Sequence, residues 1–450
     1  MSTTMQYINQ LKKDKENLVS MLQGKGVEAS NEETFTSLTP KVGTIVTDPI
    51  LQDKTVEITE NGEQTISADA GYDGLNNVTV TTNIATSGEL PEAGCVVKKY
   101  TEDGYPEEIE VGELPNYALG RNSTPIPMFS SKLKKVSVTS DITSIGNYAL
   151  ANCSSVTTIN LPDTCTTIGS YAFTKTDLSE TVLPDSIQSI GDYAFSESNF
   201  LPTSLPANLQ TVNQYGFYKT NLSLDKLPDS LQTLKNYAFS NTKLAIKTLP
   251  SSLTTIPVGC FDNIASTEIT IPSTVTSVGG YAFRNCPNLE KVNWESTYNT
   301  ISGNCFANDS KLKEVKVSST VTSIAYGSFL NCGGLVQISL PSVTKIVGTS
   351  NSTATQTSST GGFTNCSSLK AVWIGGVTSG ANIGRYAFYN CSSLIRIFIN
   401  MPRADVEALT NYTYAFMNNT GKTSIIICND DEGFMDQATF DSTDWSTVTG

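Results

Sequence analysis

The tripeptide Tyr-Ala-Phe returns along the chain at a fixed distance, and this period constrains the fold more than any other feature. The intact copies end at Phe173, Phe195, Phe239, Phe283 and Phe388, and altered copies end at Leu150, Phe217, Phe261, Phe306, Phe329, Phe363 and Phe416. From Phe173 to Phe283 the step is 22 residues each time. A unit this short cannot bury its own apolar face and must stack on its neighbours. The repeat therefore predicts a solenoid, which offers a long surface instead of one enclosed pocket.

One unit of the repeat, residues 183–195, shows how each turn is expected to fold. Four of its apolar side chains are expected to point inward: Leu183, Ile187, Ile190 and Phe195. Pro184 and Gly191 are expected to form corners. In the second half of the array a pattern typical of a strand precedes the unit, at residues 312–317, 335–340, 369–374 and 394–399. Strands in the same phase of successive units predict parallel sheets that run along the solenoid.

Composition excludes several classes of function. The chain carries 43 acidic and 29 basic residues, a net charge of -14, which disfavours nucleic acid and anionic membranes as partners. It contains no histidine, so Ser-His-Asp and Cys-His catalysis and histidine-dependent zinc sites are excluded. The acidic clusters at residues 107–110 and 430–432 lack the setting of a glycosidase or a calcium loop. We therefore predict no enzymatic activity, no cofactor and no metal site.

The ten cysteines follow the repeat and do not form paired clusters. Five of them come directly after an asparagine: Cys153, Cys286, Cys332, Cys366 and Cys391. Cys260 and Cys305 occupy the alanine position of the Tyr-Ala-Phe tripeptide. Small thiols locked to one repeat phase are typical of a stacked core. We predict reduced structural cysteines, because their spacing is unlike that of a metal site.

The first 46 residues read as a separate helical segment. Residues 5–23 predict one helix, with a heptad seam formed by Ile8, Leu11, Leu18 and Leu22 and by Lys15. This helix either packs on its own domain or forms an oligomerisation stub, for which a trimer is the expected state. The N-terminus is polar and lacks the apolar core of a secretory signal, so we predict no export by the general route. The sequence also lacks an apolar run long enough for a membrane span.

Residues 47–92 predict a small β module and a linker. Residues 55–59 alternate as a strand, 60–63 form a turn, and 64–67 are expected to pair back as a hairpin. A second turn leads into a further strand at 78–82. The solenoid is then assigned to residues 93–428, and a polar capping unit to residues 429–450.

Two aromatic residues fall in the outward phase of neighbouring strands. Trp373 and Phe398 lie one repeat apart, so we expect them on adjacent strands about 5 Å from each other. With Arg396 they form a candidate surface for a sugar ring or a protein. The alternative is that a neighbouring subunit or the inserted loop at 348–362 covers them. Trp294 and the aromatic residues of the Tyr-Ala-Phe tripeptides are expected in the core.

The unit Leu-Pro-x-Ser-Leu/Ile-x-x-Ile-Gly-x-Tyr-Ala-Phe resembles the BspA-type leucine-rich repeat. The sequence Asn-Cys-Ser-Ser-Leu that follows it, at 365–369 and 390–394, belongs to the same resemblance, which covers about 300 residues from Asn116 to Cys428. It implies a leucine-rich-repeat solenoid, β-rich with short parallel strands, preceded by the N-terminal α-helix and the β-hairpin module. It also implies adhesion to host proteins, cells or surface polymers without enzymatic chemistry.

The N-terminal part is similar to other proteins. The helix and residues 24–42 resemble the leaders of tail, baseplate and fibre virion proteins from phages of Gram-positive bacteria, and residues 58–62 with 71–80 are similar to a small module common in the same proteins. This resemblance implies a virion structural protein made in the host cytoplasm, which binds other virion proteins through its N-terminus and a host-surface polymer or protein through its solenoid. The alternatives are an architectural head-fibre or decoration protein that binds other virion proteins, and a bacterial cell-surface adhesin.

Overall fold

The computed structural model describes residues 51–58, 74–82, 96–100, 106–112, 132–139, 141–348, 360–376, 382–408, 415 and 426–448. The predicted heptad seam of Ile8, Leu11, Leu18 and Leu22 lies outside these residues, as does most of the inserted loop. The chain divides into two compact units. The first comprises Met1–Pro184 with Ser198–Phe200, and the second comprises Asp185–Glu197 with Leu201–Gly450.

The first unit contains the β module and the earliest turns of the repeat. Strand β1 (Leu51–Ile58) pairs in parallel with β2 (Gly74–Thr82), so the strand predicted at 78–82 is confirmed. The predicted return strand at 64–67 lies outside the described residues. Strand β3 (Val96–Tyr100) runs antiparallel to β4 (Pro106–Val111), which is followed by parallel β5 (Lys135–Val138) and β7 (Thr158–Asn160). Strand β6 (Ser144–Ile145) pairs in parallel with β8 (Thr167–Ile168).

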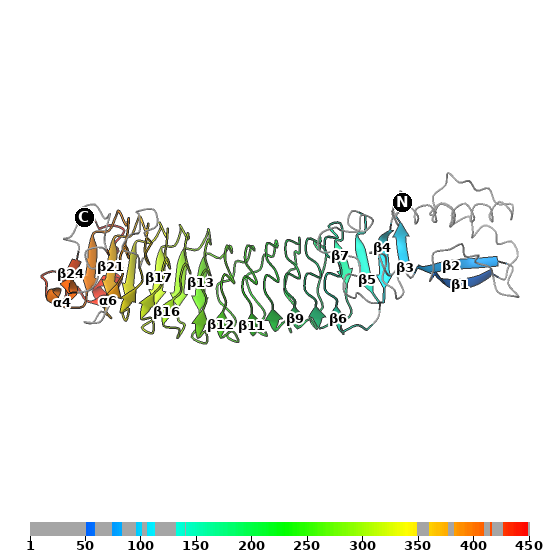
Figure 1. Cartoon of the computed structure of the whole chain (residues 1–450), viewed down its shortest axis with the longest axis horizontal. Helices are drawn as coiled ribbons and strands as arrows, with labels where there is room; N and C mark the ends of the chain where they lie inside the picture. Colours follow the sequence, from blue (N-terminus) through cyan, green and yellow to red (C-terminus); the bar gives the residue numbers. More distant parts are fainter. Residues whose placement is uncertain are drawn as a thin grey trace. The chain divides into compact units, whose positions relative to one another are not determined.

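The second unit is a β-solenoid with short strands on one side of its turns and, from β13 onward, longer strands on another side (Figure 1). The short strands of one side are β9 (Ser189–Ile190), β10 (Thr211–Val212), β11 (Thr233–Leu234), β12 (Thr255–Ile256), β14 (Ser277–Val278), β16 (Thr300–Ile301), β18 (Ser323–Ile324), β20 (Lys345–Ile346) and β22 (Asn382–Ile383). The longer strands of the other side are β13 (Glu268–Ile271), β15 (Lys291–Trp294), β17 (Glu314–Val317), β19 (Gln337–Leu340), β21 (Ala371–Ile374), β23 (Arg396–Ile399) and β24 (Ile426–Cys428). The helices described are α4 (Arg403–Glu407) and α6 (Gln437–Ser442). The ladders between these strands are parallel, as the repeat predicts.

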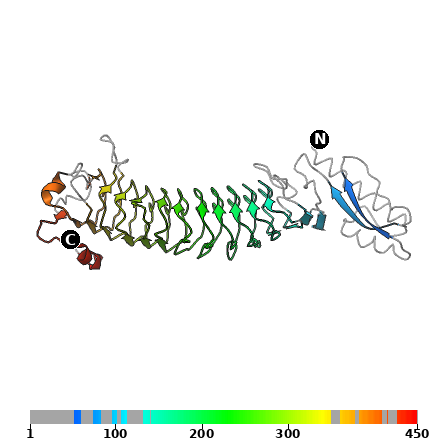
Figure 2. The ribbon, with the colours of Figure 1, turned by 90° about the horizontal axis from the view of Figure 1, so that it is seen from below.

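A column of stacked phenylalanine rings forms the core of the second unit. Ring centroids of neighbouring turns lie 5.0 to 5.8 Å apart from Phe217 to Phe388. The phenylalanines of this column are fully or almost fully buried, as the period predicts. Each turn therefore contributes one ring to a core that no single turn could complete, and Figure 2 shows these turns side by side from a second direction.

The tyrosine of the tripeptide differs from the sequence-based expectation. Tyr193, Tyr215 and Tyr237 are half-buried, have φ between 54° and 58°, and stack on one another with centroids 4.6 and 4.9 Å apart. The expectation that all aromatic residues of the tripeptide lie in the core is therefore wrong for these tyrosines, because a left-handed corner directs them outward. Gly259 takes the same corner at φ 60°, where a Cβ would lie 2.1 Å from the Tyr237 ring.

The cysteine prediction is confirmed for the part of the chain that the structure describes. All nine of its cysteines are free and buried: Cys153, Cys165, Cys260, Cys286, Cys305, Cys332, Cys366, Cys391 and Cys428. The Cys332 thiol donates to the carbonyl of Phe306 at 3.0 Å, and Cys366 donates to Phe329 at 3.1 Å. Burial raises the pKa of Cys153 to about 12, so this group stays a neutral thiol. Among the described helices, none is long and apolar enough to span a membrane.

Candidate functional surfaces

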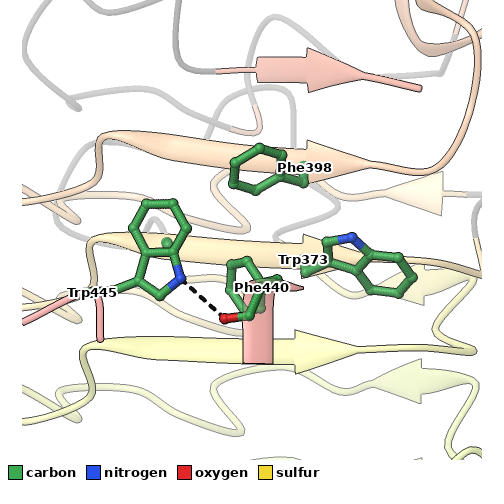
Figure 3. Close-up of a cluster of buried hydrophobic side chains, with 5 residues drawn as sticks. Trp373, Phe398, Phe440 and Trp445 are labelled. Atoms are coloured by element: carbon green, nitrogen blue, oxygen red, sulfur yellow. Dashed lines mark hydrogen bonds between the residues drawn. The ribbon is translucent and has the colours of Figure 1, made fainter. Parts of the chain in front are cut away.

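The structure brings Trp373 and Phe398 together as predicted but does not leave them exposed. They face each other in register on β21 and β23. Trp373 is only 6% exposed and Phe398 only 2% exposed, so their assignment to an open contact surface is wrong. Neither of the two covers considered from the sequence is needed to explain this burial among the described residues. Their cover is the chain's own C-terminal segment, residues 434–448, which contributes Phe440 and Trp445 (Figure 3).

The C-terminal segment is fixed on the sheet by aromatic contacts and hydrogen bonds. The ring of Phe398 lies 5.9 Å from that of Phe440 and 5.8 Å from that of Trp445. The indole Nε1 of Trp373 donates to the Met435 carbonyl at 3.1 Å. Lys370 Nζ donates to two carbonyls of the same segment, those of Ser446 and Val448. The predicted capping unit therefore does more than close the array with polar residues, because its apolar side chains also cover the outer face of the sheet. We call residues 434–448 the C-terminal clasp.

Local sequence explains why this segment forms a short helix. Asp436 precedes α6, and its side chain accepts a hydrogen bond from the backbone N–H of Thr439 at 2.8 Å. Bonds of this kind satisfy a free donor of the first helical turn. They also lower the pKa of Asp436, because they stabilise its charged form. The helix presents Phe440 to the sheet, whereas Arg396, the third predicted contact residue, stays exposed.

The acidic cluster near the last strand is occupied by protein groups. Cys428, Asp430 and Asp431 lie close enough together to be considered as metal ligands. However, Arg403 donates to Asp431 from Nε at 3.0 Å and from Nη2 at 2.5 Å, and its backbone N–H donates to Asp430. The Arg403 guanidinium lowers the pKa of Asp431. These carboxylates therefore link α4 to the strand end, and Arg403 occupies the oxygens that a cation would need.

The glutamates of β4 are also used within the protein. Glu107 lies between Lys99 and Lys134, each at 2.7 Å, and these two ammonium groups lower its pKa to about 2. Lys98 pairs with Glu110 at 2.8 Å. The described side chains thus form an ion-pair ladder and do not form two carboxyls placed across a cleft.

The short-strand side of the second unit carries a surface that the sequence reading did not single out. On β9, β10, β11 and β12, and at the residue before each strand, the outward side chains are amides or hydroxyls: Gln188, Ser189, Gln210, Thr211, Gln232, Thr233, Thr254 and Thr255. We call this set the amide–hydroxyl face. In the sequence, the amide–hydroxyl face corresponds to the two variable residues that lie between the buried aliphatic positions of each unit.

An open groove lies beside the amide–hydroxyl face. It has a volume of about 460 Å³ and is lined by Asp192, Asn213, Gln214, Leu234, Lys235, Asn236, Thr255 and Pro257. Three of these residues, Asn213, Lys235 and Pro257, occupy the corner position that Gly279 takes in the next turn. A Cβ at Gly279 would lie 2.5 Å from the backbone nitrogen of Val258. At the groove, therefore, Asn213, Lys235 and Pro257 place side chains at a corner where the flanking turns have Gly191 and Gly279.

Comparison with known proteins identifies the family of the repeat array. A family model described as the BspA type leucine rich repeat region matches residues 128–245, 232–357 and 351–449. A leucine-rich repeat protein from Bacteroides ovatus is 22% identical, with a TM-score of 0.44, and the match covers 73% of this chain and 97% of that one. The pneumococcal vaccine antigen PcpA is 18% identical, with a TM-score of 0.43 and coverage of 71% and 85%. A leucine rich cell surface protein from Faecalibacterium prausnitzii is 19% identical, with a TM-score of 0.35 and coverage of 70% and 95%. The comparison with curated proteins returned no match.

Proposed function

The chain belongs to the BspA-type leucine-rich repeat family, and from this membership we propose that it is a non-enzymatic attachment protein that binds through the surface of its solenoid. The observation that carries the proposal is the amide–hydroxyl face with its open groove, a repeated surface on the second unit. Repeated weak contacts on such a surface raise the residence time of a partner without one strong site. The acidic clusters are engaged in ion pairs, which gives no support to a catalytic role.

We further propose that the attachment protein is part of a virion, with residues 1–46 binding other virion proteins. The support is the resemblance of residues 24–42 to phage leaders. A bacterial cell-surface adhesin is the second candidate, and the adhesion implied by the repeat family supports it. A purely architectural virion role loses its main argument, because the chain's own C-terminal segment covers Trp373 and Phe398.

Whole-cell binding tests the attachment function. The full-length protein, labelled with a fluorophore, is incubated with a panel of Gram-positive and Gram-negative cells, and bound protein is counted by flow cytometry. We expect saturable binding to a subset of the panel. Binding to none of the cells, by a protein whose circular dichroism shows that it is folded, would remove the attachment proposal.

Light scattering tests the proposed oligomer. We expect the full-length protein to form a trimer through Ile8, Leu11, Leu18 and Leu22, because a heptad seam buries these side chains against the helices of neighbouring copies. A charge at two seam positions, Leu11→Asp with Leu18→Asp, should then reduce the mass to that of a monomer. Equal masses for the wild type and this variant would show that the seam is not an assembly device.

A further inference from the structure

We propose that the amide–hydroxyl face, together with the groove beside it, binds a neutral polysaccharide. This inference rests on the proposed attachment function and names the ligand class. Its basis is the chemistry of the face, the free hydrogen-bonding groups that it displays, and their repetition from turn to turn.

The amide–hydroxyl face carries no charge. Its eight side chains are glutamine, serine or threonine. The longer-strand side of the same unit differs, because Lys247 pairs with Glu268 at 2.9 Å and Lys291 pairs with Glu314 at 3.4 Å. A charged polymer would find no counter-charge on the amide–hydroxyl face, and the groove beside it carries one charge of each sign, Asp192 and Lys235. A neutral polymer requires no counter-charge. The chemistry of the face therefore favours an uncharged ligand.

The side chains of the face have unused hydrogen-bonding capacity. The backbone ladder is complete there, since the N–H of Gln210 donates to the Gln188 carbonyl at 2.9 Å and that of Gln232 donates to the Gln210 carbonyl at 3.0 Å. Within the described ranges, the side chains of Gln188, Gln210, Gln232, Thr211 and Thr233 make no hydrogen bond to protein. Each amide offers a donor and an acceptor, and each hydroxyl offers both. A ligand rich in hydroxyl groups can satisfy them.

The face repeats the same groups at the spacing of the strands. Thr211 pairs in register with Ser189 on one side and with Thr233 on the other. Neighbouring strands lie about 4.8 Å apart, so each step from β9 to β11 presents one more amide and one more hydroxyl, and β12 adds two hydroxyls. A polysaccharide also repeats its hydroxyls along its length. A chain laid along the stacking direction can therefore make the same contact at successive turns.

The groove offers a place for an individual sugar ring. Pro257 provides apolar contact for the C–H face of a ring, and Gln214 and Asn236 provide planar amides for adjacent hydroxyls. Asp192 is held in place because its side chain accepts the backbone N–H of Gln214 at 3.0 Å. The volume of the groove is in the usual range for small-ligand sites.

A protein partner fits the face less well. Binding hot spots are enriched in tryptophan, tyrosine and arginine, and the amide–hydroxyl face contains none of these residues. The net charge of -14 also disfavours nucleic acid. Polysaccharide is thus the ligand class that these side chains favour.

The inference is tested with the full-length protein in two assays. One is co-sedimentation with insoluble chitin, cellulose and β-1,3-glucan, and the other is affinity electrophoresis in mannan and dextran. The test variant is Thr211→Val with Thr233→Val and Thr255→Val, which removes three hydroxyls and keeps the side-chain shape and strand preference. The matched control, Thr203→Val with Thr248→Val and Thr267→Val, removes three exposed hydroxyls outside the face. We expect the wild type and the control to bind at least one polysaccharide equally, and the test variant to bind it about tenfold or more weakly.

A second variant, Gln210→Glu with Gln232→Glu, adds charge at nearly constant volume and should also weaken binding. Equal binding by the wild type and both face variants would overturn the inference, and so would failure of the wild type to bind any of the five polysaccharides. If the wild type still binds whole cells in that case, the attachment function stands and only the ligand class is wrong. Loss of cell binding after protease treatment of the cells, with unchanged binding by the face variants, would identify a protein partner instead.

Discussion

The indole Nε1 of Trp373 donates a hydrogen bond of 3.1 Å to the carbonyl of Met435, which ties a strand of the repeat array to a segment 62 residues further along the chain. The ring of Phe398, one strand away, packs against Phe440 from the same segment. The last sheet of the second unit is therefore closed on its outer face by residues that follow the repeat. An aromatic pair that would otherwise contact water becomes part of the core.

Phe440→Ala should release this C-terminal clasp. Phe440 is fully buried, and loss of such a ring typically costs about 3 to 5 kcal/mol. The expected result is exposure of Trp373 and Phe398, seen as a red shift of tryptophan emission and as binding of a hydrophobic dye. The exposed control Glu432→Ala should change neither signal. An unchanged emission spectrum in Phe440→Ala would mean that the clasp does not depend on this ring.

The nine described cysteines should resist alkylation in the native protein. They are buried, and desolvation raises the pKa of Cys153 to about 12 and that of Cys428 to about 11, so the reactive thiolate is scarce. Iodoacetamide labelling read by mass spectrometry should modify these sites slowly in buffer and rapidly in denaturant. Cys428 should react before Cys153, because its thiol is the more acidic of the two. Rapid native labelling of Cys332 or Cys366 would contradict their place in the core.

The fixed period was enough to predict the phenylalanine column and the parallel short strands, because a ring that recurs every 22 residues has only its neighbouring turns to pack against. The position of Tyr215 was not predictable in this way. Its orientation depends on a left-handed corner, and tyrosine is not a residue that usually indicates positive φ. The sequence pattern shows which position repeats, but not that the corner turns the ring outward.

The burial of Trp373 could not be predicted from the repeat either. Its strand phase is outward, as inferred, but its cover comes from Phe440 and Trp445, which lie beyond the last repeat and share none of its pattern. A contact between segments so far apart in sequence depends on tertiary packing. The amide–hydroxyl face could not be predicted from the repeat for the same reason. That the Gln210 side chain makes no hydrogen bond to protein follows only from the folded array.

Asp309 should make stability depend on pH in the direction opposite to that of a surface aspartate. It occupies the cysteine position after Asn308, is fully buried, and accepts the backbone N–H of Cys286 at 2.7 Å. Its Oδ2 has no hydrogen-bond partner among the described residues. Burial, with a smaller contribution from the charge of Asp262, raises the pKa of Asp309 well above its ordinary value of 3.8.

The folded state therefore favours the neutral carboxyl of Asp309. Its stabilising contribution is fully present below the unfolded pKa near 3.8 and is lost as the pH rises through the higher folded value. Urea unfolding from acidic to mildly alkaline pH should show this loss. Asp309→Cys, which restores the residue found at Cys332 and Cys366, should remove this component and raise stability at neutral pH. A wild type and variant with parallel pH profiles would show that Asp309 is not neutral in the fold.

Asn331 should be hard to replace, because it serves the fold in two ways. Its φ of 61° is left-handed, a conformation that asparagine and glycine tolerate better than alanine. Its side chain also joins a ladder, in which Nδ2 donates to Asn308 at 2.7 Å and Oδ1 accepts from Asn365 at 2.8 Å. Asn331→Ala loses both contributions, and we expect a decrease of about 2 kcal/mol in the free energy of unfolding.

Asn331→Gly separates the two roles of this residue. Glycine adopts the left-handed corner without a Cβ penalty, so only the ladder bonds and some chain entropy are lost, and the decrease should be about 1 kcal/mol. The denaturant midpoint should therefore be highest for the wild type, intermediate for Asn331→Gly and lowest for Asn331→Ala. If glycine is as destabilising as alanine, the ladder alone accounts for the asparagine. If both variants match the wild type, neither the corner nor the ladder stabilises the array at this turn.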